Sequence, residues 1–287
     1  MISTATYKKL CGVVSITDGG VVMVDAEKDG ARWRVKDHSF TPFESEALDA
    51  AVISEAIASS LKEGVELTAI TLPDDMARFA VLNFKSLPSN PVEAAKIIGW
   101  KAEKEHFAKE GTLKTSFSVI SRTDEGVVVL AVSIDSLLLD ELESNLDTLG
   151  ISVPFINTHT LSLINLFSSV LTSDSPFAFV ARFTDHFTAA LINNSVVSMI
   201  RLKEFEGEDE FMNEVKGSLR YFVDILQGKS VDRLYLVNEG GEGVLGELGL
   251  EVNSLAASTV AELGGAEAGE NGIYLLSALG LLESMLD

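Results

Sequence analysis

Short runs of apolar, aromatic and β-branched residues, separated by polar turn residues, occur in two stretches of the chain, and each stretch predicts three short strands joined by tight turns. In the first stretch the strands are Cys11–Thr17, Gly20–Ala26 and Ala31–Asp37. In the second stretch they are Phe177–Phe183, Phe187–Ile192 and Ser195–Leu202. Glycine and asparagine tolerate the positive φ of tight hairpins, and the turns are placed at Asp18-Gly19, Asp29-Gly30 and Asn193-Asn194. The repeated unit predicts an internally duplicated α/β protein.

A period of 3.6 residues predicts the helices between these strands. In the first half we expect a helix at Glu46–Leu61, a strand at Leu67–Leu72, a helix at Asp135–Leu149, a strand at Ser152–Asn157 and a helix at Thr158–Leu171. In the second half we expect a helix at Asp209–Leu226, strands at Arg233–Val237 and Glu251–Leu255, and a helix at Ile273–Leu286. Gly217 lies inside the first of these second-half helices, where close packing is the expected reason for a glycine. Ser173–Pro176 predicts the boundary between halves 1–175 and 176–287.

A small α+β subdomain is predicted as an insert in the first half, at about residues 77–133. Its expected elements are a strand at Phe79–Leu87, a helix at Val92–Phe107, and strands at Leu113–Ser121 and Val127–Val132. Asn90 and Pro91 favour a helix start at this point. Trp100 lies within this helix; its spacing favours a core position, and an exposed partner-binding position is the alternative.

The chain is acidic, with a net charge of −21, and 46% of its residues are hydrophobic. That composition is ample for packed cores. The charge repels phosphate backbones and anionic lipid headgroups, so we expect no nucleic-acid partner and no direct membrane insertion. Simple solubility and a basic protein partner both remain open as reasons for the charge. No apolar run approaches membrane-spanning length and the N-terminus lacks a complete signal-peptide core, so a cytoplasmic protein is expected.

Motifs for catalysis and metal binding are absent from the sequence. Cys11 is the only cysteine, which excludes an internal disulfide, and the four histidines form no ligand-spaced pair. There is no Gly-x-Ser-x-Gly elbow and no Walker Gly-Lys-Ser/Thr motif. We therefore expect no metal site and name no catalytic residue.

Four segments carry a resemblance to a known family: VLNFKSLPSNPVEAAKIIGWKAEKE, VVVLAVSIDSLLLDELESNLDTLGISVPFINTHTLSLINLF, FMNEVKGSLRYFVDILQ and NGIYLLSALGL. In order and spacing they resemble the type IV pilus assembly protein PilM family, which has an actin-like ATPase fold, a duplicated fold of the ribonuclease H type. The resemblance covers nearly the whole length and implies an actin-like fold whose insert is similar to that of FtsA. The cytoplasmic part of the type II secretion protein GspL looks similar too.

The family's two phosphate loops are degenerate in this sequence. The first loop usually reads Asp-Ile-Gly, and Ser15, Ile16 and Thr17 stand there, followed by Asp18, Gly19 and Gly20, with Val22 in place of a lysine. In the second loop the aligned residues are Ala181, Arg182 and Phe183. The carboxylates that would organise magnesium are therefore missing. The residues that could still contribute to a nucleotide site are Asp18, Gly19, Gly20, Asp185, Gly240 and Gly241.

The resemblance implies a non-catalytic cytoplasmic scaffold of the type IV pilus inner-membrane platform, held at the membrane by the tail of a PilN-like protein. No cofactor is expected. Other platform proteins are further partners that it implies, and a homo-oligomer is compatible with it. The tail groove would draw on Phe84, Leu87 and Trp100. The alternatives are a nucleotide-binding ATPase that uses ATP and magnesium, and a GspL-like scaffold of a type II secretion system.

Overall fold

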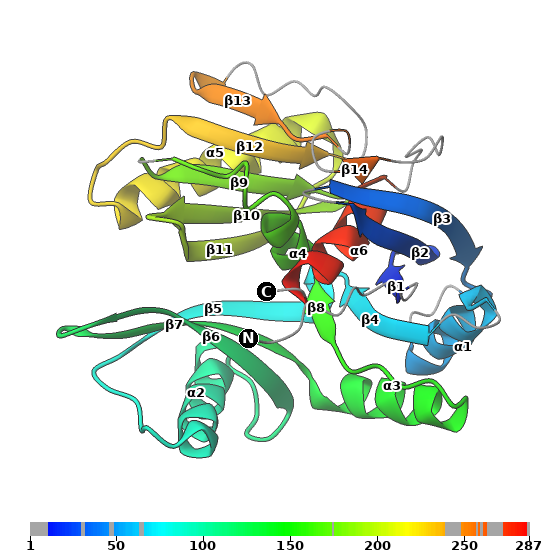
Figure 1. The fold of residues 1–287 in the computed structure, drawn as a ribbon. Coiled ribbons are helices and arrows are strands. Elements are labelled where there is room, and N and C mark those ends of the chain that lie inside the picture. The colour runs from blue at the N-terminus through cyan, green and yellow to red at the C-terminus, as the bar shows by residue number, and fades with distance from the viewer. Residues whose placement is uncertain are drawn as a thin grey trace. The chain divides into compact units, whose positions relative to one another are not determined.

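The computed structural model describes residues 11–29, 32–45, 49–62, 66–173, 175–238, 248–256, 258, 261–262 and 272–285 of the chain. Contacts divide the chain into two compact units (Figure 1). The first unit comprises Met1–Leu72, Leu142–Leu166 and Ala256–Asp287, and the second unit comprises Pro73–Glu141 and Phe167–Leu255. Each unit is described separately below.

The first unit is built on a sheet in the order β14-β3-β2-β1-β4-β8. Its strands are β1 (Cys11–Ile16), β2 (Gly20–Asp29), β3 (Arg32–Pro42), β4 (Glu66–Leu72), β8 (Ile156–Thr158) and β14 (Ala261–Glu262). β1, β2 and β3 pair antiparallel, whereas β1 pairs with β4, and β4 with β8, in parallel. The side chains of Val13, Val14 and Ile16 are all buried, so both faces of the central strand β1 are covered.

The helices of this unit are α1 (Ala50–Ser60), α4 (His159–Leu166) and α6 (Gly272–Ser284). α1 begins after Asp49, whose carboxylate accepts hydrogen bonds from the backbone N–H groups of Ala51 and Val52, both 3.0 Å long. α6 packs on β1, β2, β4 and α4. It approaches α4 so closely that a Cβ at Gly280 would lie 1.9 Å from the Ser162 carbonyl oxygen.

The second unit repeats the strand order of the first. Its strands are β9 (Phe177–Arg182), β10 (His186–Asn193), β11 (Val196–Glu204), β12 (Arg233–Asn238) and β13 (Glu251–Ser254). The order β11-β10-β9-β12-β13 matches β3-β2-β1-β4-β8, with the same antiparallel and parallel pairings. The predicted duplication is therefore confirmed.

The β10–β11 hairpin turns one residue later than predicted. Asn193 pairs with Val196, and the two turn residues are Asn194 and Ser195, with φ of 53° and 61°. Positive φ at both central positions is the geometry that suits the twist of the flanking strands. The sequence favoured asparagine at both positions, and the structure uses a serine for the second.

Helix α5 (Gly207–Ile225) covers one face of the second sheet. It buries an apolar stripe against the strands, and the buried residues on the helix are Phe211, Met212, Val215 and Phe222. Gly217 does not mark close packing as expected, because a Cβ at this position would have no heavy atom within 4 Å. The closely packed helical glycine is Gly280.

The insert forms its own small layer, as predicted, but the contacts group it with the second unit and not with the first half. A sheet in the order β5-β7-β6 carries α2 (Pro91–Glu105) on one face. The strands are β5 (Ala77–Phe84), β6 (Leu113–Thr123) and β7 (Gly126–Asp135), a short 3₁₀ turn at Asp74–Met76 precedes them, and α3 (Ser136–Thr148) follows. Asn90 caps α2 by accepting a 2.9 Å hydrogen bond from the Val92 N–H.

The contacts divide the chain differently from the predicted halves. The C-terminal helix α6 was expected in the second half, yet it packs in the first unit beside α4. It is buried on all sides, so its apolar pattern identifies a core helix without indicating which core it joins. No helix in the described ranges is long and apolar enough to cross a membrane.

Candidate functional site

By its resemblance to the PilM family, the β1–β2 turn corresponds to the first phosphate loop of that family. Within it the Thr17 hydroxyl accepts hydrogen bonds from the backbone N–H groups of Gly19 (3.2 Å) and Gly20 (3.0 Å). The Thr17 N–H in turn donates to the Gly20 carbonyl at 2.8 Å. Backbone N–H groups are what such a loop offers to a phosphate. Here the Thr17 hydroxyl already accepts hydrogen bonds from the N–H groups of both Gly19 and Gly20.

Gly20 is required by close packing and not by a ligand. A Cβ at Gly20 would lie 2.3 Å from the Thr41 carbonyl oxygen and 2.7 Å from the Phe40 ring. Asp18 and Gly19 are exposed at the tip of the same turn. The structure therefore brings three predicted nucleotide-site residues together, in a turn that is closed by its own side chain.

Ser15, aligned with the aspartate of that loop, belongs to a buried network of hydroxyl groups and an imidazole. Its hydroxyl lies 3.0 Å from the Ser277 hydroxyl on α6 and 3.2 Å from His159 Nε2 on α4. Ser277 also lies 3.2 Å from the Thr71 hydroxyl on β4 and donates to the Tyr274 carbonyl. Ser15, Thr71, His159 and Ser277 are all fully buried. A charged carboxylate would be costly at this position.

The β9–β10 turn, at the second phosphate loop, is also closed on itself. The Phe183 N–H donates to the His186 carbonyl at 2.9 Å, and the two rings stack with centroids 4.8 Å apart. The Asp185 Oδ1 lies 2.8 Å from the His186 Nδ1, and 71% of the Asp185 side chain is exposed. The exposed carboxylate of this turn is thus engaged with the neighbouring imidazole.

Arg182, in the same loop, is fixed by a bidentate ion pair with Glu208 at the start of α5. The two guanidinium nitrogens donate to the two carboxylate oxygens at 3.1 and 2.7 Å. The guanidinium also lies over the Phe211 ring, 4.2 Å from its centroid. Its charge is neutralised within the protein.

The predicted nucleotide-site residues come from different parts of the chain. Asp18, Gly19 and Gly20 lie in the first unit, and Asp185 lies in the second. Gly240 and Gly241 lie outside the described residues. Within the described part of the chain, no three acidic, histidine or cysteine side chains are grouped so that they could hold a metal ion.

Phe84 and Leu87, predicted to face a partner, are half-buried against the core of the insert. That core comprises Ala80, Leu82, Ile98, Ala102, Val127, Val129 and Ala131. The Lys101 ammonium lies 4.5 Å from the centroid of the Phe84 ring and donates to the Asn83 carbonyl. Phe84 and Leu87 therefore contribute to the packing of the insert.

Trp100 is 49% exposed on the outer face of α2, so the core position that its spacing favoured is wrong. Ile98 and Ala102 fill the core instead, and both are fully buried. The Lys104 ammonium lies 3.7 Å from the Trp100 ring centroid, and Ile97 is also exposed. A large exposed aromatic side chain is a common feature of protein-binding faces. Of the three predicted partner residues, Trp100 alone has this character.

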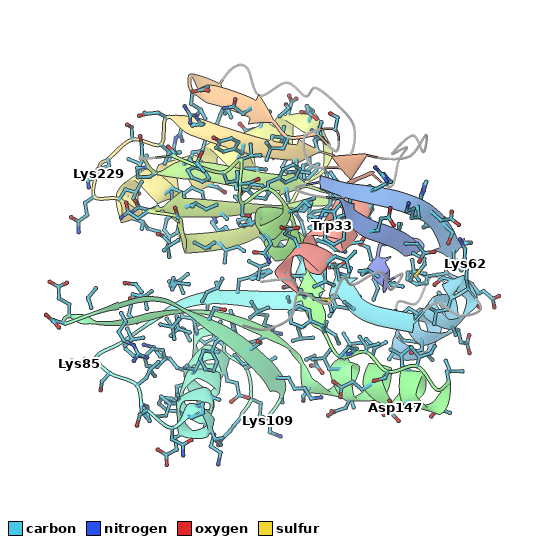
Figure 2. The ribbon with its side chains drawn as sticks, in the orientation of Figure 1. Trp33, Lys62, Lys85, Lys109, Asp147 and Lys229 are labelled. Atoms are coloured by element: carbon cyan, nitrogen blue, oxygen red, sulfur yellow. The ribbon has the colours of Figure 1, made fainter. Side chains whose placement is uncertain are left out.

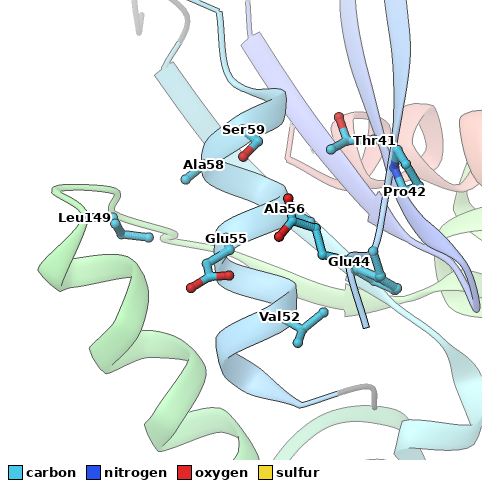
Figure 3. Close-up of a pocket in the computed structure, with 10 residues that line it drawn as sticks. Thr41, Pro42, Glu44, Val52, Glu55, Ala56, Ala58, Ser59 and Leu149 are labelled. Carbon is cyan, nitrogen blue, oxygen red and sulfur yellow. The ribbon is translucent and has the colours of Figure 1, made fainter. Parts of the chain in front are cut away.

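A groove beside α1 was not found from the sequence. It is a cavity of about 480 Å³ between α1, the end of β3 and Leu149 (Figure 3). Its apolar lining includes Pro42, Val52, Ala56 and Leu149, and two carboxylates, Glu44 and Glu55, stand on its wall. Neither carboxylate has an ion-pair partner among the described residues. The sequence gives little signal for this groove, because the residues that line it are scattered over three elements.

No family model matches this sequence, and no curated protein matches it. Solved structures do match, and they define the fold. The protein has the actin-like fold, confirming the predicted class: it is similar to a Bacteroides thetaiotaomicron protein with an actin-like ATPase fold and unknown function, at 13% identity and a TM-score of 0.55. That match covers 96% of this chain and 98% of the other.

Two further structures are similar over nearly the whole length. A chain of the PilM–PilN type IV pilus biogenesis complex aligns with a TM-score of 0.77 at 14% identity, covering 98% of this chain and 99% of that one. The cytoplasmic domain of EpsL, an inner-membrane component of the type II secretion system of Vibrio cholerae, aligns with a TM-score of 0.58 at 12% identity. It covers 96% of this chain and 95% of that domain.

Proposed function

We propose that this protein is a non-catalytic actin-like scaffold of a type IV pilus inner-membrane platform. In this proposal it stays cytoplasmic and is held at the membrane by the tail of a PilN-like protein. The higher TM-score of the PilM–PilN structure, 0.77 against 0.58 for EpsL, favours the pilus over the type II secretion system.

The main support for a protein without catalytic activity is the closed β1–β2 turn. Thr17 accepts from the Gly19 and Gly20 N–H groups, and the aligned aspartate position holds the fully buried hydroxyl of Ser15. Phosphoryl transfer depends on positioned metal ions and on donors directed at the phosphates. In this turn a hydroxyl stands where the family has its metal-binding carboxylate, and Thr17 already accepts hydrogen bonds from the N–H groups of Gly19 and Gly20.

A nucleotide-binding experiment tests this part directly. The melting temperature of the purified protein is measured with and without saturating Mg·ATP. A ligand at about a hundred times its dissociation constant would add roughly 2.7 kcal/mol, which moves a melt by several degrees. We expect no shift. A clear shift that is lost on Asp18→Ala or Asp185→Ala would instead establish nucleotide binding and reopen the ATPase alternative.

Two surfaces are candidates for the tail. The groove beside α1 combines an apolar lining with Glu44 and Glu55, which suits a tail that carries apolar and basic residues. The outer face of α2 presents Trp100 as a rigid anchor. Both features suit capture of a short linear peptide, and capture of this kind needs no hydrolysis.

A labelled peptide of the cytoplasmic tail of the organism's PilN-like protein separates the two surfaces. Its affinity is measured by fluorescence anisotropy for wild type, Trp100→Ala, the pair Glu44→Gln and Glu55→Gln, and Val119→Ala. Val119 is the matched control because it is 43% exposed on β6 and belongs to neither surface. We expect the wild-type protein to bind the tail. Either Trp100→Ala or the pair Glu44→Gln and Glu55→Gln should weaken this binding at least tenfold. Absence of binding to wild type would refute the proposed partner.

A further inference from the structure

We propose that the flank of α5 carries a second binding site, for a small organic anion with an apolar body. The site is a cavity of about 630 Å³ between α5 and the chain that leads into β12 and β13. It lies wholly within the second unit, and none of its residues belongs to either phosphate loop or to the candidate tail surfaces. Its volume falls in the range typical of small-molecule sites.

The floor of the cavity is apolar and anchored to the core. Leu219 and Val223 contribute from α5, and Leu248 and Leu250 from the segment that precedes β13. Leu219, Leu248 and Leu250 are partly buried hydrophobics that pack on the core of the second sheet. The floor is therefore held in place by the fold, and an apolar ligand surface would be removed from water there.

The wall of the cavity is cationic. Lys216 and Arg220 are four residues apart on α5, so their side chains are neighbours on one face of the helix. Two adjacent cations can hold one carboxylate or a similar anionic group. The ligand therefore needs an anionic head as well as an apolar body.

These two cations have no ion-pair or hydrogen-bond partner within the described part of the chain. The protein has 43 acidic residues and 22 lysine and arginine residues, so carboxylates are plentiful. Some cations of the same unit do pair with a carboxylate, namely Arg182 with Glu208, Lys203 with Glu214 and Arg233 with Glu251. The side chains of Lys85 and Lys229, labelled in Figure 2, have no such partner among the described residues either, but neither lines this cavity. Two unpaired cations beside an apolar cavity are thus left for a ligand.

Asp224 fixes the orientation of the ligand. It lies one turn beyond Arg220 on α5 and lines the same cavity. Its carboxylate repels an anion, so the anionic head belongs beside Lys216 and Arg220, and the apolar body extends along Leu219 and Val223. Replacing Asp224 by asparagine removes this repulsion and strengthens binding.

The test uses octanoate as the probe and follows methyl NMR shifts of the whole purified protein. Acetate has the same head without the body, and octyltrimethylammonium has the same body with the opposite charge. We expect octanoate to shift the methyl signals of Leu219, Val223, Leu248 and Leu250. Acetate should leave them unchanged, and the ammonium should bind at least tenfold more weakly.

Variants then test the cationic wall. The double variant Lys216→Gln and Arg220→Gln should weaken the binding of octanoate at least tenfold. Asp224→Asn should strengthen octanoate binding by a few fold. Lys203→Gln is the matched control, since Lys203 is a cation of the same unit that already pairs with Glu214. Equal binding of the ammonium, or full binding to the double variant, would show an apolar groove without anion selectivity and overturn the site. Failure of octanoate to bind wild type would overturn it too.

Discussion

The hydroxyl oxygens of Ser15 and Ser277 lie 3.0 Å apart, although 262 residues separate them in the sequence. The contact joins β1, the central strand of the first sheet, to the C-terminal helix α6. It also places a neutral, fully buried group where the resemblance to the PilM family expects an aspartate. The departure from the family's loop sequence at position 15 therefore lies in the core and not on the surface.

Restoring the aspartate should damage the fold and not restore a nucleotide site. We expect Ser15→Asp to lower the free energy of unfolding by on the order of 3 kcal/mol, because the carboxylate would be fully buried and only the His159 imidazole stands within reach as a cationic partner. Ser15→Ala should cost about 1 kcal/mol, the usual value of a lost hydrogen bond. Urea unfolding measures both changes. A Ser15→Asp protein as stable as wild type that melts higher with Mg·ATP would contradict this account.

The hydroxyl of Thr17 should stabilise its turn more than a comparable threonine elsewhere. Thr17→Ala leaves the N–H groups of Gly19 and Gly20 without their acceptor, and we expect a loss of about 1 kcal/mol in urea unfolding. Thr123→Ala is the matched control, because Thr123 accepts only from the Glu125 N–H in an exposed turn. Its effect should stay within about 0.5 kcal/mol. Equal losses for the two variants would show that the Thr17 contacts add nothing special.

Two helical glycines should respond to alanine in opposite directions. Gly280→Ala would place a Cβ 1.9 Å from the Ser162 carbonyl oxygen, and we expect a loss of more than about 3 kcal/mol as α4 and α6 are forced apart. Gly217→Ala meets open space and should gain about 1 kcal/mol from higher helix propensity. Thermal and urea unfolding of the two variants check the signs. A neutral Gly280→Ala would mean that the two helices can separate at little cost.

Local patterns in the sequence were enough to predict most elements. Most strands of the two hairpin units and helix α5 follow their predicted ranges closely, although β3 runs to Pro42, beyond the predicted Asp37. Runs of apolar and β-branched residues and a 3.6-residue period are local signals of burial, which is why these elements could be predicted. The insert was found for the same reason. Its helix start follows from Asn90 and Pro91, which act locally.

Long-range relationships were not accessible from these patterns. The partners of Ser15 come from α4 and α6, far along the chain, and nothing near Ser15 encodes them. α6 is apolar around its whole circumference, so its pattern could not indicate that it packs in the first unit. The groove with Glu44 and Glu55 depends on how α1 lies beside β3 and Leu149. These features follow from the arrangement of elements and not from any one of them.

The exposure of Trp100 makes a contrast with its neighbour Ile98 that unfolding can measure. Trp100→Ala removes a side chain that is 49% exposed, so the free energy of unfolding should change by no more than about 0.5 kcal/mol. Ile98→Ala removes a fully buried side chain from the core of the insert and should cost about 3 kcal/mol. A large loss for Trp100→Ala would show that this residue serves the core, as its spacing in the sequence suggested.

Asp25 should make the protein less stable as the pH rises, which is the reverse of the usual behaviour of a carboxylate. Its side chain is buried on β2, its Oδ1 accepts no hydrogen bond from any described residue, and Lys62 lies 4.0 Å from Oδ2. Burial is the main cause that raises the pKa of Asp25 above its ordinary value of 3.8, with Asp37 adding to the rise and Lys62 opposing it. Folding therefore favours the protonated form, and this stability is lost as the pH rises through the folded pKa.

The matched pair Asp25→Asn and Asp37→Asn tests this sign. Asp37 is exposed and pairs with Lys62, which is the main cause that lowers its pKa, so its contribution is present at neutral pH and lost on acidification. Relative to wild type, Asp25→Asn should be more stable at pH 7 and equal to it well below pH 3.8. Asp37→Asn should be slightly less stable at pH 7, by a small amount because water screens the exposed pair. Urea midpoints recorded across this pH range decide the matter: a destabilised Asp25→Asn at pH 7 would mean that Lys62 more than offsets the cost of burying the charge.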